Sequence, residues 1–299
     1  MNIRKFEPYI YPTNDYVFHR VFAREGNEEI TKAFLNTILS TKVEEIRLDS
    51  NPIQMPMYLG DKTSILDVKA ILDENGRKKL CNIEMQIRNQ YNMDHRIPYY
   101  WAKLYSGQLK QGEDYEKLCK TICIVIVDFE INDKDTDFCS EYGILKKNVK
   151  GEDILLTDDL EFYIIELPKL RKKLENAEKI DNKKLVAWLK YINNPNEVEE
   201  KDMEDNEYLE EAYRVLEDIS SSEEEKILAE YRIDAWRNEQ SVKKHERNEG
   251  IKEGIKKGFE EGTEKTKKEI AKKLLDKGVD ISIIIEASGL TKEEIEELK

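Results

Sequence analysis

The chain has 299 residues, of which 39% are hydrophobic and 37% charged, and its formal net charge is −14. This length suits one sizeable domain with an appendage, or two modest domains. No apolar run approaches the roughly 18–20 residues that a membrane span needs, and the opening residues lack the apolar stretch of a secretory signal. We therefore expect a cytoplasmic protein without a membrane partner.

The acidic charge belongs to the second half of the sequence. Residues 1–130 hold 18 basic and 19 acidic side chains, so this half can present a local basic face to a phosphate backbone. The four cysteines form no C-x-x-C pair and the three histidines lie far apart, which argues against a zinc site or a histidine cluster.

The apolar pattern predicts a mixed core followed by helices alone. Helices are expected as a pair within 13–40 and over 94–111, 181–193, 206–218, 222–262 and a small tail within 267–299. Strands are expected over 43–49, 53–58, 64–73, 79–88, 120–130, 137–147 and 160–167. This order favours an α/β or α+β core with an all-helical C-terminal extension.

Two of these strands predict a hairpin with a defined register. They are separated by Asn75-Gly76, and Asn-Gly between alternating runs is a strong hairpin signal. A two-residue loop there places Asp67 directly opposite Glu84, with Cβ atoms about 4.5–5.5 Å apart. The polar face then holds Asp67, Lys69, Asn82, Glu84, Gln86 and Arg88.

Two facing carboxylates repel each other, and a divalent cation removes the conflict. Hard cations such as Mg²⁺ take one or two carboxylates and keep several waters, and one such water can serve as a nucleophile. Asp67 and Glu84 are therefore candidate metal ligands. The alternative is a solvated strand face that carries two acids by chance.

Five motifs in order resemble a known family. They are PTNDYVFHRVFA, FLNTIL, ILDVKA, NIEMQ and RIPYYWAKLYSGQLKQGEDYEKL. Together they resemble the recombination-promoting nucleases (Rpn-like, or transposase-like) of the PD-(D/E)XK superfamily, from about residue 12 to about 190 and more loosely beyond. The resemblance implies a restriction-endonuclease-like core, with a mixed sheet flanked by helices.

The resemblance also implies roles for particular residues. Asp67 and Glu84 match the metal-binding aspartate and glutamate, and the Met85 backbone carbonyl is the expected third ligand. Asp15 matches a recurrent acid that reaches the metal through water. Gln86 stands where the superfamily usually has a catalytic lysine, a departure that the family often shows. Mg²⁺ is the expected cofactor, with Mn²⁺ and Ca²⁺ as alternatives.

The helix after the hairpin is the candidate DNA-binding element. Arg96, Tyr100, Lys103 and Lys110 are spaced to share one face, and a cationic stripe with an aromatic suits a phosphate backbone. Lys103 is also a candidate for the catalytic positive charge that Gln86 lacks. The alternative for each of these residues is a solvated helix face.

The C-terminal part predicts self-association. Gly250, Gly254, Gly258 and Gly262 recur every four residues, and glycines cost helix stability unless they admit a close neighbour. We interpret them as a soluble self-association helix, with a flexible linker as the alternative. The tail resembles a helix-turn-helix, but its acid-rich end argues against reading DNA and favours oligomerisation.

We therefore expect three parts: a PD-(D/E)XK nuclease-like domain over 1–195, a charged helical region with the glycine helix over 196–262, and an oligomerising tail over 263–299. The predicted function is Mg²⁺-dependent hydrolysis of DNA by an endonuclease that forms homo-oligomers. Its expected context is recombination, DNA transfer or defence against mobile DNA. The alternative is a degenerate nuclease fold that acts as an oligomeric DNA-binding or regulatory module, and RNA remains an alternative substrate.

Overall fold

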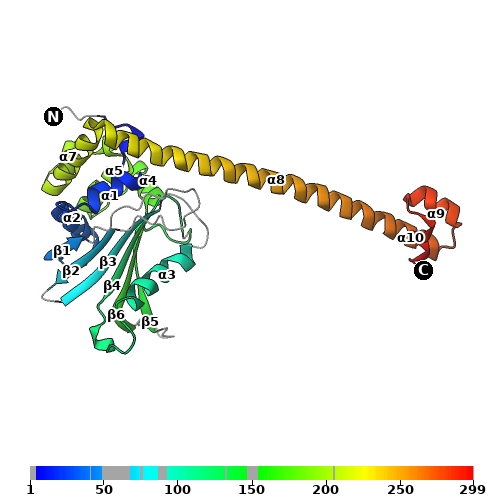
Figure 1. The fold of residues 1–299 in the computed structure, drawn as a ribbon, viewed down its shortest axis with the longest axis horizontal. Helices are drawn as coiled ribbons and strands as arrows, with labels where there is room; N and C mark the ends of the chain where they lie inside the picture. Colours follow the sequence, from blue (N-terminus) through cyan, green and yellow to red (C-terminus); the bar gives the residue numbers. More distant parts are fainter. Residues whose placement is uncertain are drawn as a thin grey trace. The chain divides into compact units, whose positions relative to one another are not determined.

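A computed structural model describes the chain except for residues 1–4, 41, 49–67, 75–76, 87–92, 132, 147–153, 205 and 299. The described chain divides into two compact units, one up to Asp234 and one from Ala235. Figure 1 shows the ribbon. The helices are α1 (Asp15–Phe22), α2 (Glu28–Ile38), α3 (Met93–Ser106), α4 (Leu167–Glu175), α5 (Lys183–Asn193), α6 (Glu200–Met203), α7 (Glu207–Ser221), α8 (Glu223–Asp276), α9 (Ile281–Ser288) and α10 (Lys292–Glu296).

The described strands of the first unit form one mixed sheet in the order β1-β2-β3-β4-β6-β5. They are β1 (Glu45–Leu48), β2 (Val68–Glu74), β3 (Arg77–Gln86), β4 (Thr121–Val127), β5 (Cys139–Lys146) and β6 (Ile154–Glu166). β3, β4 and β6 run parallel to one another, and the other neighbours are antiparallel. The carboxyl ends of the three parallel strands therefore lie side by side at one end of the sheet.

The hairpin register is the predicted one over all its described pairs. They run from Glu74 opposite Arg77 to Val68 opposite Ile83. The same alternation decides which side chains the sheet buries, because residues two apart on a strand share a face. The local pattern of β2 and β3 was therefore sufficient to predict how they pair.

The sheet is covered on both faces, and each face has its own apolar cluster. The larger cluster joins α1, α2, α5 and α7 to Val68, Ile83 and their neighbours, around the fully buried Trp188. The smaller cluster joins Met93 and Ile97 of α3 to β4 and β6. Figure 1 shows α3 apart from the other helices of this unit. These two layers confirm an α/β core of the predicted kind.

Several elements differ from their predicted bounds. α3 ends at Ser106, before 111, because both polar atoms of the Gln108 amide bond the Cys119 backbone at 3.1 and 2.7 Å and fold the chain back. α4 was not predicted as a separate helix, and α8 continues past 262 to Asp276. The strand expected over 53–58 lies outside the described residues.

The second unit has a small core of its own. Ala271 of α8 packs with Ile284, Leu290 and Ile295 of the tail. Gly289 ends α9 at a φ of 67°, a backbone conformation that glycine adopts without steric cost. The Thr291 hydroxyl and the Glu294 carboxylate then form a capping box at the start of α10. No described helix is both long and apolar enough to cross a membrane.

Candidate active site

β3 carries two buried polar side chains on the face of the sheet that α3 covers. Asn82 and Glu84 are 5% and 3% exposed. The register sets them beside Cys123 and Val125 of β4, which belong to the apolar cluster under α3. A carboxylate in such surroundings requires compensation, because an unpaired buried charge is costly.

Arg96 of α3 approaches this carboxylate, and Tyr100 of the same helix bonds Arg96. Nη2 of Arg96 lies 4.0 Å from Oε1 of Glu84. The Tyr100 hydroxyl accepts hydrogen bonds from Nε and Nη2 of Arg96 at 3.1 and 2.7 Å. Residues four apart on a helix are neighbours, so the phenol holds the guanidinium close to Glu84. The helical spacing predicted the Arg96–Tyr100 pair but not its position against β3.

The side-chain oxygen of Asn82 is a second notable atom on this face. It is buried and has no hydrogen-bond donor among the described residues. An unsatisfied buried acceptor costs about 1–3 kcal/mol, and native structures usually supply it with a donor, a water or an ion. β3 thus presents two oxygen-bearing side chains, Asn82 and Glu84, two residues apart on one face.

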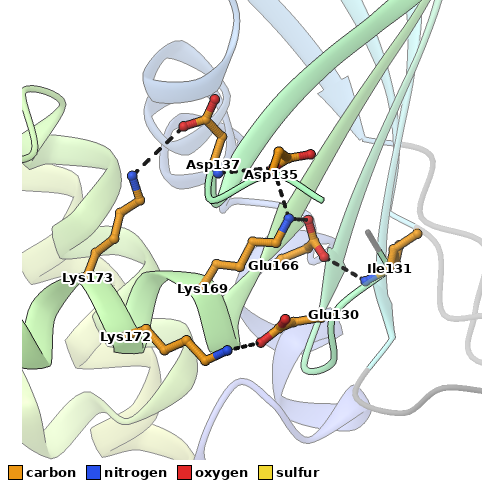
Figure 2. Close-up of polar contacts among 8 residues, drawn as sticks. All are labelled: Glu130, Ile131, Asp135, Asp137, Glu166, Lys169, Lys172 and Lys173. Atoms are coloured by element: carbon orange, nitrogen blue, oxygen red, sulfur yellow. Dashed lines mark hydrogen bonds and ion pairs between the residues drawn. The ribbon is translucent and has the colours of Figure 1, made fainter. Parts of the chain in front are cut away.

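Glu166, at the end of β6, is a carboxylate that the sequence did not single out. The parallel register aligns Gln86, Val127 and Glu166 across three strands, so Glu166 lies at the same end of the sheet as the carboxyl end of β3. Figure 2 shows its environment: Nζ of Lys169 is 2.6 Å from Oε2 of Glu166 and 3.0 Å from Oδ1 of Asp135.

This ion pair is almost completely buried. Glu166 and Lys169 are 2% and 4% exposed, and Oε1 of Glu166 accepts the Ile131 backbone N–H at 2.6 Å. Burial disfavours the charged form of Lys169, but its hydrogen bonds to Glu166 and Asp135 outweigh that effect and raise its pKa. The pair therefore ties the loop after β4 to the start of α4.

Further cations of α4 pair with the same loop. Arg171 and Lys172 lie 2.6 and 2.5 Å from Asp128 and Glu130, as Figure 2 shows for the second pair. Exposed pairs of this kind contribute little to stability, but in them the cationic side chains of α4 are already paired with carboxylates. A phosphate backbone would have to displace these acids to bind there, which leaves α3 as the better candidate for DNA contact.

Comparison with known proteins supports the motif-based assignment. Residues 12–246, most of the chain, match the PD-(D/E)XK nuclease family transposase. The chain belongs to this family. Residues 264–299 match the C-terminal HTH domain of the Rpn/YhgA-like nuclease family. No curated protein and no solved structure matches the chain. The family establishes a nuclease-type function, and PD-(D/E)XK nucleases generally use divalent metals.

The predicted partner of Glu84 stays a prediction. Asp67 lies outside the described residues, one step beyond the last described pair of the hairpin, Val68 with Ile83. Gln86 ends β3, and its side chain also lies outside the described part. Within the described ranges no three His, Cys, Asp or Glu side chains gather into a metal-binding group.

The other predicted ligands are placed as follows. Met85 packs its side chain against the larger core. The predicted ligand is its backbone carbonyl, between Glu84 and Gln86 on β3, and this role stays a prediction. Oδ1 of Asp15 is 3.4 Å from Nε of Arg232. Burial raises the pKa of Asp15, although the Arg232 charge acts in the opposite direction. These contacts lead to α8, and the water-mediated role of Asp15 stays a prediction.

The cationic stripe is shorter than predicted. Lys103 is exposed on α3, two turns after Arg96. Lys110 lies beyond the end of the helix, where its backbone N–H donates to Glu113 at 2.7 Å. The expectation that Lys110 shares a helix face with Arg96 is therefore wrong, because the turn held by Gln108 ends α3 first.

The C-terminal part of this nuclease also requires a revision. The HTH match over 264–299 supports a DNA-binding type of domain in the tail, which its acidic end had argued against. Self-association there stays a prediction. Gly250, Gly254, Gly258 and Gly262 lie within α8, and a Cβ at any of them would meet no described atom within 4 Å.

Proposed function

We propose that this family member is an endonuclease that hydrolyses DNA phosphodiester bonds with water as the nucleophile and Mg²⁺ as its cofactor. The observation that carries the proposal is Glu84, a carboxylate 3% exposed on a central strand, with the Arg96 guanidinium 4.0 Å away. Burying such a charge costs stability, so a carboxylate held this way in a nuclease fold is a candidate for function.

The donor atoms on this face fit a hard divalent cation. Mg²⁺ and Ca²⁺ take oxygen ligands, and both Glu84 and the buried side-chain oxygen of Asn82 are of that kind. Asp67, Glu84 and the Met85 carbonyl would hold the cation, with Asp15 reaching it through water. A divalent cation bound there would lower the pKa of water and offset charge on a phosphoryl group.

The cationic side chains of α3 supply the DNA contacts in this proposal. Arg96, steadied by the Tyr100 hydroxyl, can exchange its contact with Glu84 for a phosphate when DNA arrives. Lys103 is exposed two turns further along, on the same side of the helix. We assign to Lys103 the positive charge that Gln86 does not provide, and to Gln86 the orientation of water.

A plasmid-cleavage assay tests the proposal. Supercoiled DNA should be nicked or linearised in Mg²⁺ or Mn²⁺ and left intact in EDTA, with Ca²⁺ lanes to show whether that ion supports cleavage. Asp67→Ala and Glu84→Ala should each abolish cleavage. Glu161→Ala is the matched control, because Glu161 is a carboxylate of the same sheet paired with Lys120. Cleavage at the wild-type rate by either site variant would refute the assignment.

Two other outcomes have definite meanings. DNA binding without cleavage in any metal would favour the alternative, a degenerate nuclease fold that serves as a binding or regulatory module. Faster cleavage of RNA than of DNA in parallel lanes would reassign the substrate. The family's transposase description and the HTH domain support DNA, in recombination, DNA transfer or defence against mobile elements.

A further inference from the structure

β5 forms an unusual edge of the sheet. It is the terminal strand of the described sheet, and its neighbour β6 begins before the part that pairs with β4. The described pairing of β6 with β4 begins at Leu160 opposite Thr121. Residues 154–157 of β6 instead pair with 144–146 of β5. The end of this hairpin is thus a two-stranded ribbon.

The ribbon and the part of β5 next to it expose a cluster of large apolar side chains. They are between 40% and 74% exposed, and we call them the β5 edge patch: Tyr142, Ile144, Leu145, Ile154, Leu155 and Leu156. Consecutive residues of a strand point to opposite faces, so both faces of the ribbon are apolar. An exposed apolar edge strand readily pairs with another strand, and clustered exposed apolar surface marks a contact site.

The irregularities of this hairpin do not protect the edge. Bulges often blunt an edge strand. Here the pairing advances two residues on β5, from Tyr142 to Ile144, while β6 advances five, from Phe162 to Thr157. The extra residues belong to the inner strand, and β5 continues as a strand from Cys139 to Lys146.

The charges of β5 indicate what pairs with it. The strand reads Glu141, four residues without charge, then Lys146, and both charged side chains are exposed. An antiparallel copy of the same strand places acid near lysine at both ends and apolar residues between them. A parallel copy places like charges together. Exposed Asp158 on the adjoining part of β6 disfavours a phosphate backbone as the occupant.

We propose that the β5 edge patch is a self-association surface, at which β5 pairs antiparallel with β5 of a second copy. Such pairing is isologous, with the same patch contributed by both subunits. It extends the sheet by main-chain hydrogen bonds, as in other cases of strand addition. This surface is separate from the glycine helix and does not depend on nuclease activity.

Charge exchange provides the sharpest test on the full chain. Glu141→Lys should raise the dissociation constant of the dimer by about tenfold, because two unlike-charge contacts become like-charge contacts. Adding Lys146→Glu should restore dimerisation, since the strand is again complementary to itself. Sedimentation equilibrium measures both variants, and circular dichroism checks that they are folded.

A second pair of variants separates pairing from general loss of apolar surface. Ile144→Lys should abolish the association that β5 contributes, whereas Ile71→Lys should not, although both isoleucines are 40% exposed strand residues. Ile71 lies on β2, which already has neighbours on both sides. Hydrogen exchange at those amides of residues 139–146 that do not bond to β6 should be slow in wild type and in Ile71→Lys, and fast in Ile144→Lys.

Three results would overturn the proposal. They are a monomeric wild-type chain, a double charge variant no better associated than Glu141→Lys, or exchange over 139–146 that does not change with protein concentration. Loss of association in Ile144→Lys together with recovery in the charge-exchange variant would establish it.

Discussion

Removing Lys169 should expose the cost of a buried carboxylate. In Lys169→Met, Glu166 keeps the Ile131 backbone N–H at 2.6 Å but loses the ammonium at 2.6 Å from its other oxygen. Asp135, 38% exposed, can return to water. Glu166, 2% exposed, cannot, so the destabilisation should come almost wholly from this residue.

The size of the effect follows from how Glu166 can respond. Breaking a buried pair by removing one partner typically costs about 3–5 kcal/mol. A buried carboxylate that has lost its cation can limit that cost by taking up a proton, and the free energy of this protonation falls by about 1.36 kcal/mol for each pH unit that the solution is made more acidic. The limit is therefore about 2.7 kcal/mol lower at pH 5 than at pH 7. The penalty should therefore shrink as the pH falls.

Urea unfolding followed by tryptophan fluorescence, at pH 7 and pH 5, measures this penalty. The pKa of Lys169 is raised in the folded protein, so the stability that its charge contributes does not vary with pH below the unfolded pKa of 10.5. The wild-type free energy of unfolding therefore does not change between pH 7 and pH 5 because of Lys169. Glu166→Gln with Lys169→Met is the control, and it should cost little and show no pH dependence, because no charge remains buried.

Two results would refute this reasoning. One is a Lys169→Met penalty below about 1 kcal/mol at pH 7, which would place Glu166 in contact with water despite its burial. The other is a penalty equal at both pH values, which would mean that the cost comes from the lost packing of the lysine side chain and not from the lost ion pair.

Three further predictions concern DNA binding, the attachment of α8 and assembly. Arg96→Ala and Lys103→Ala should each weaken DNA binding and reduce the salt slope by roughly one unit per lost phosphate contact. The carboxylate of Glu225, on the first turn of α8, accepts hydrogen bonds from the Tyr16 hydroxyl and the Arg20 guanidinium of α1. Glu225→Gln should lower the free energy of unfolding at pH 7 by about 1–2 kcal/mol, because these hydrogen bonds are weakened or lost. Burial alone would raise the pKa of Glu225, but those hydrogen bonds lower it below 4.5, so this stabilisation is present above that pH and is lost as the pH falls through the lowered pKa. Gly254→Leu with Gly258→Leu should weaken association through α8, because overpacking costs about 1–3 kcal/mol per site.

Each of these predictions has a contrary result. Salt slopes equal to wild type in both α3 variants would return that helix to the solvated-face interpretation. A Glu225→Gln penalty that persists unchanged at pH 3 would disconnect it from the titration. An oligomer mass unaltered by the double leucine variant, with intact protection of β5, would restrict self-association to the sheet edge.

The sequence alone determined the features that depend on neighbouring residues. The β2–β3 register follows from Asn75-Gly76 and the alternation around it, so every described pair matched. The Thr291 capping box is likewise local. The family could be recognised from five motifs because their residue types and order are written directly in the chain.

Only the tertiary structure decided which distant groups meet. Arg96 and Glu84 approach each other because α3 packs on the face of β3 that carries Glu84. Glu166 lies at the same end of the sheet as Gln86 only because β3, β4 and β6 pair in parallel. Parallel pairing and helix packing depend on the shape and burial of side chains throughout the core. They cannot be predicted from a short stretch of sequence, because the contacting residues lie far apart in the chain. Helical spacing alone predicted that Lys110 lies on α3. The structure ends the helix earlier, because the Gln108 amide bonds the backbone of the distant Cys119.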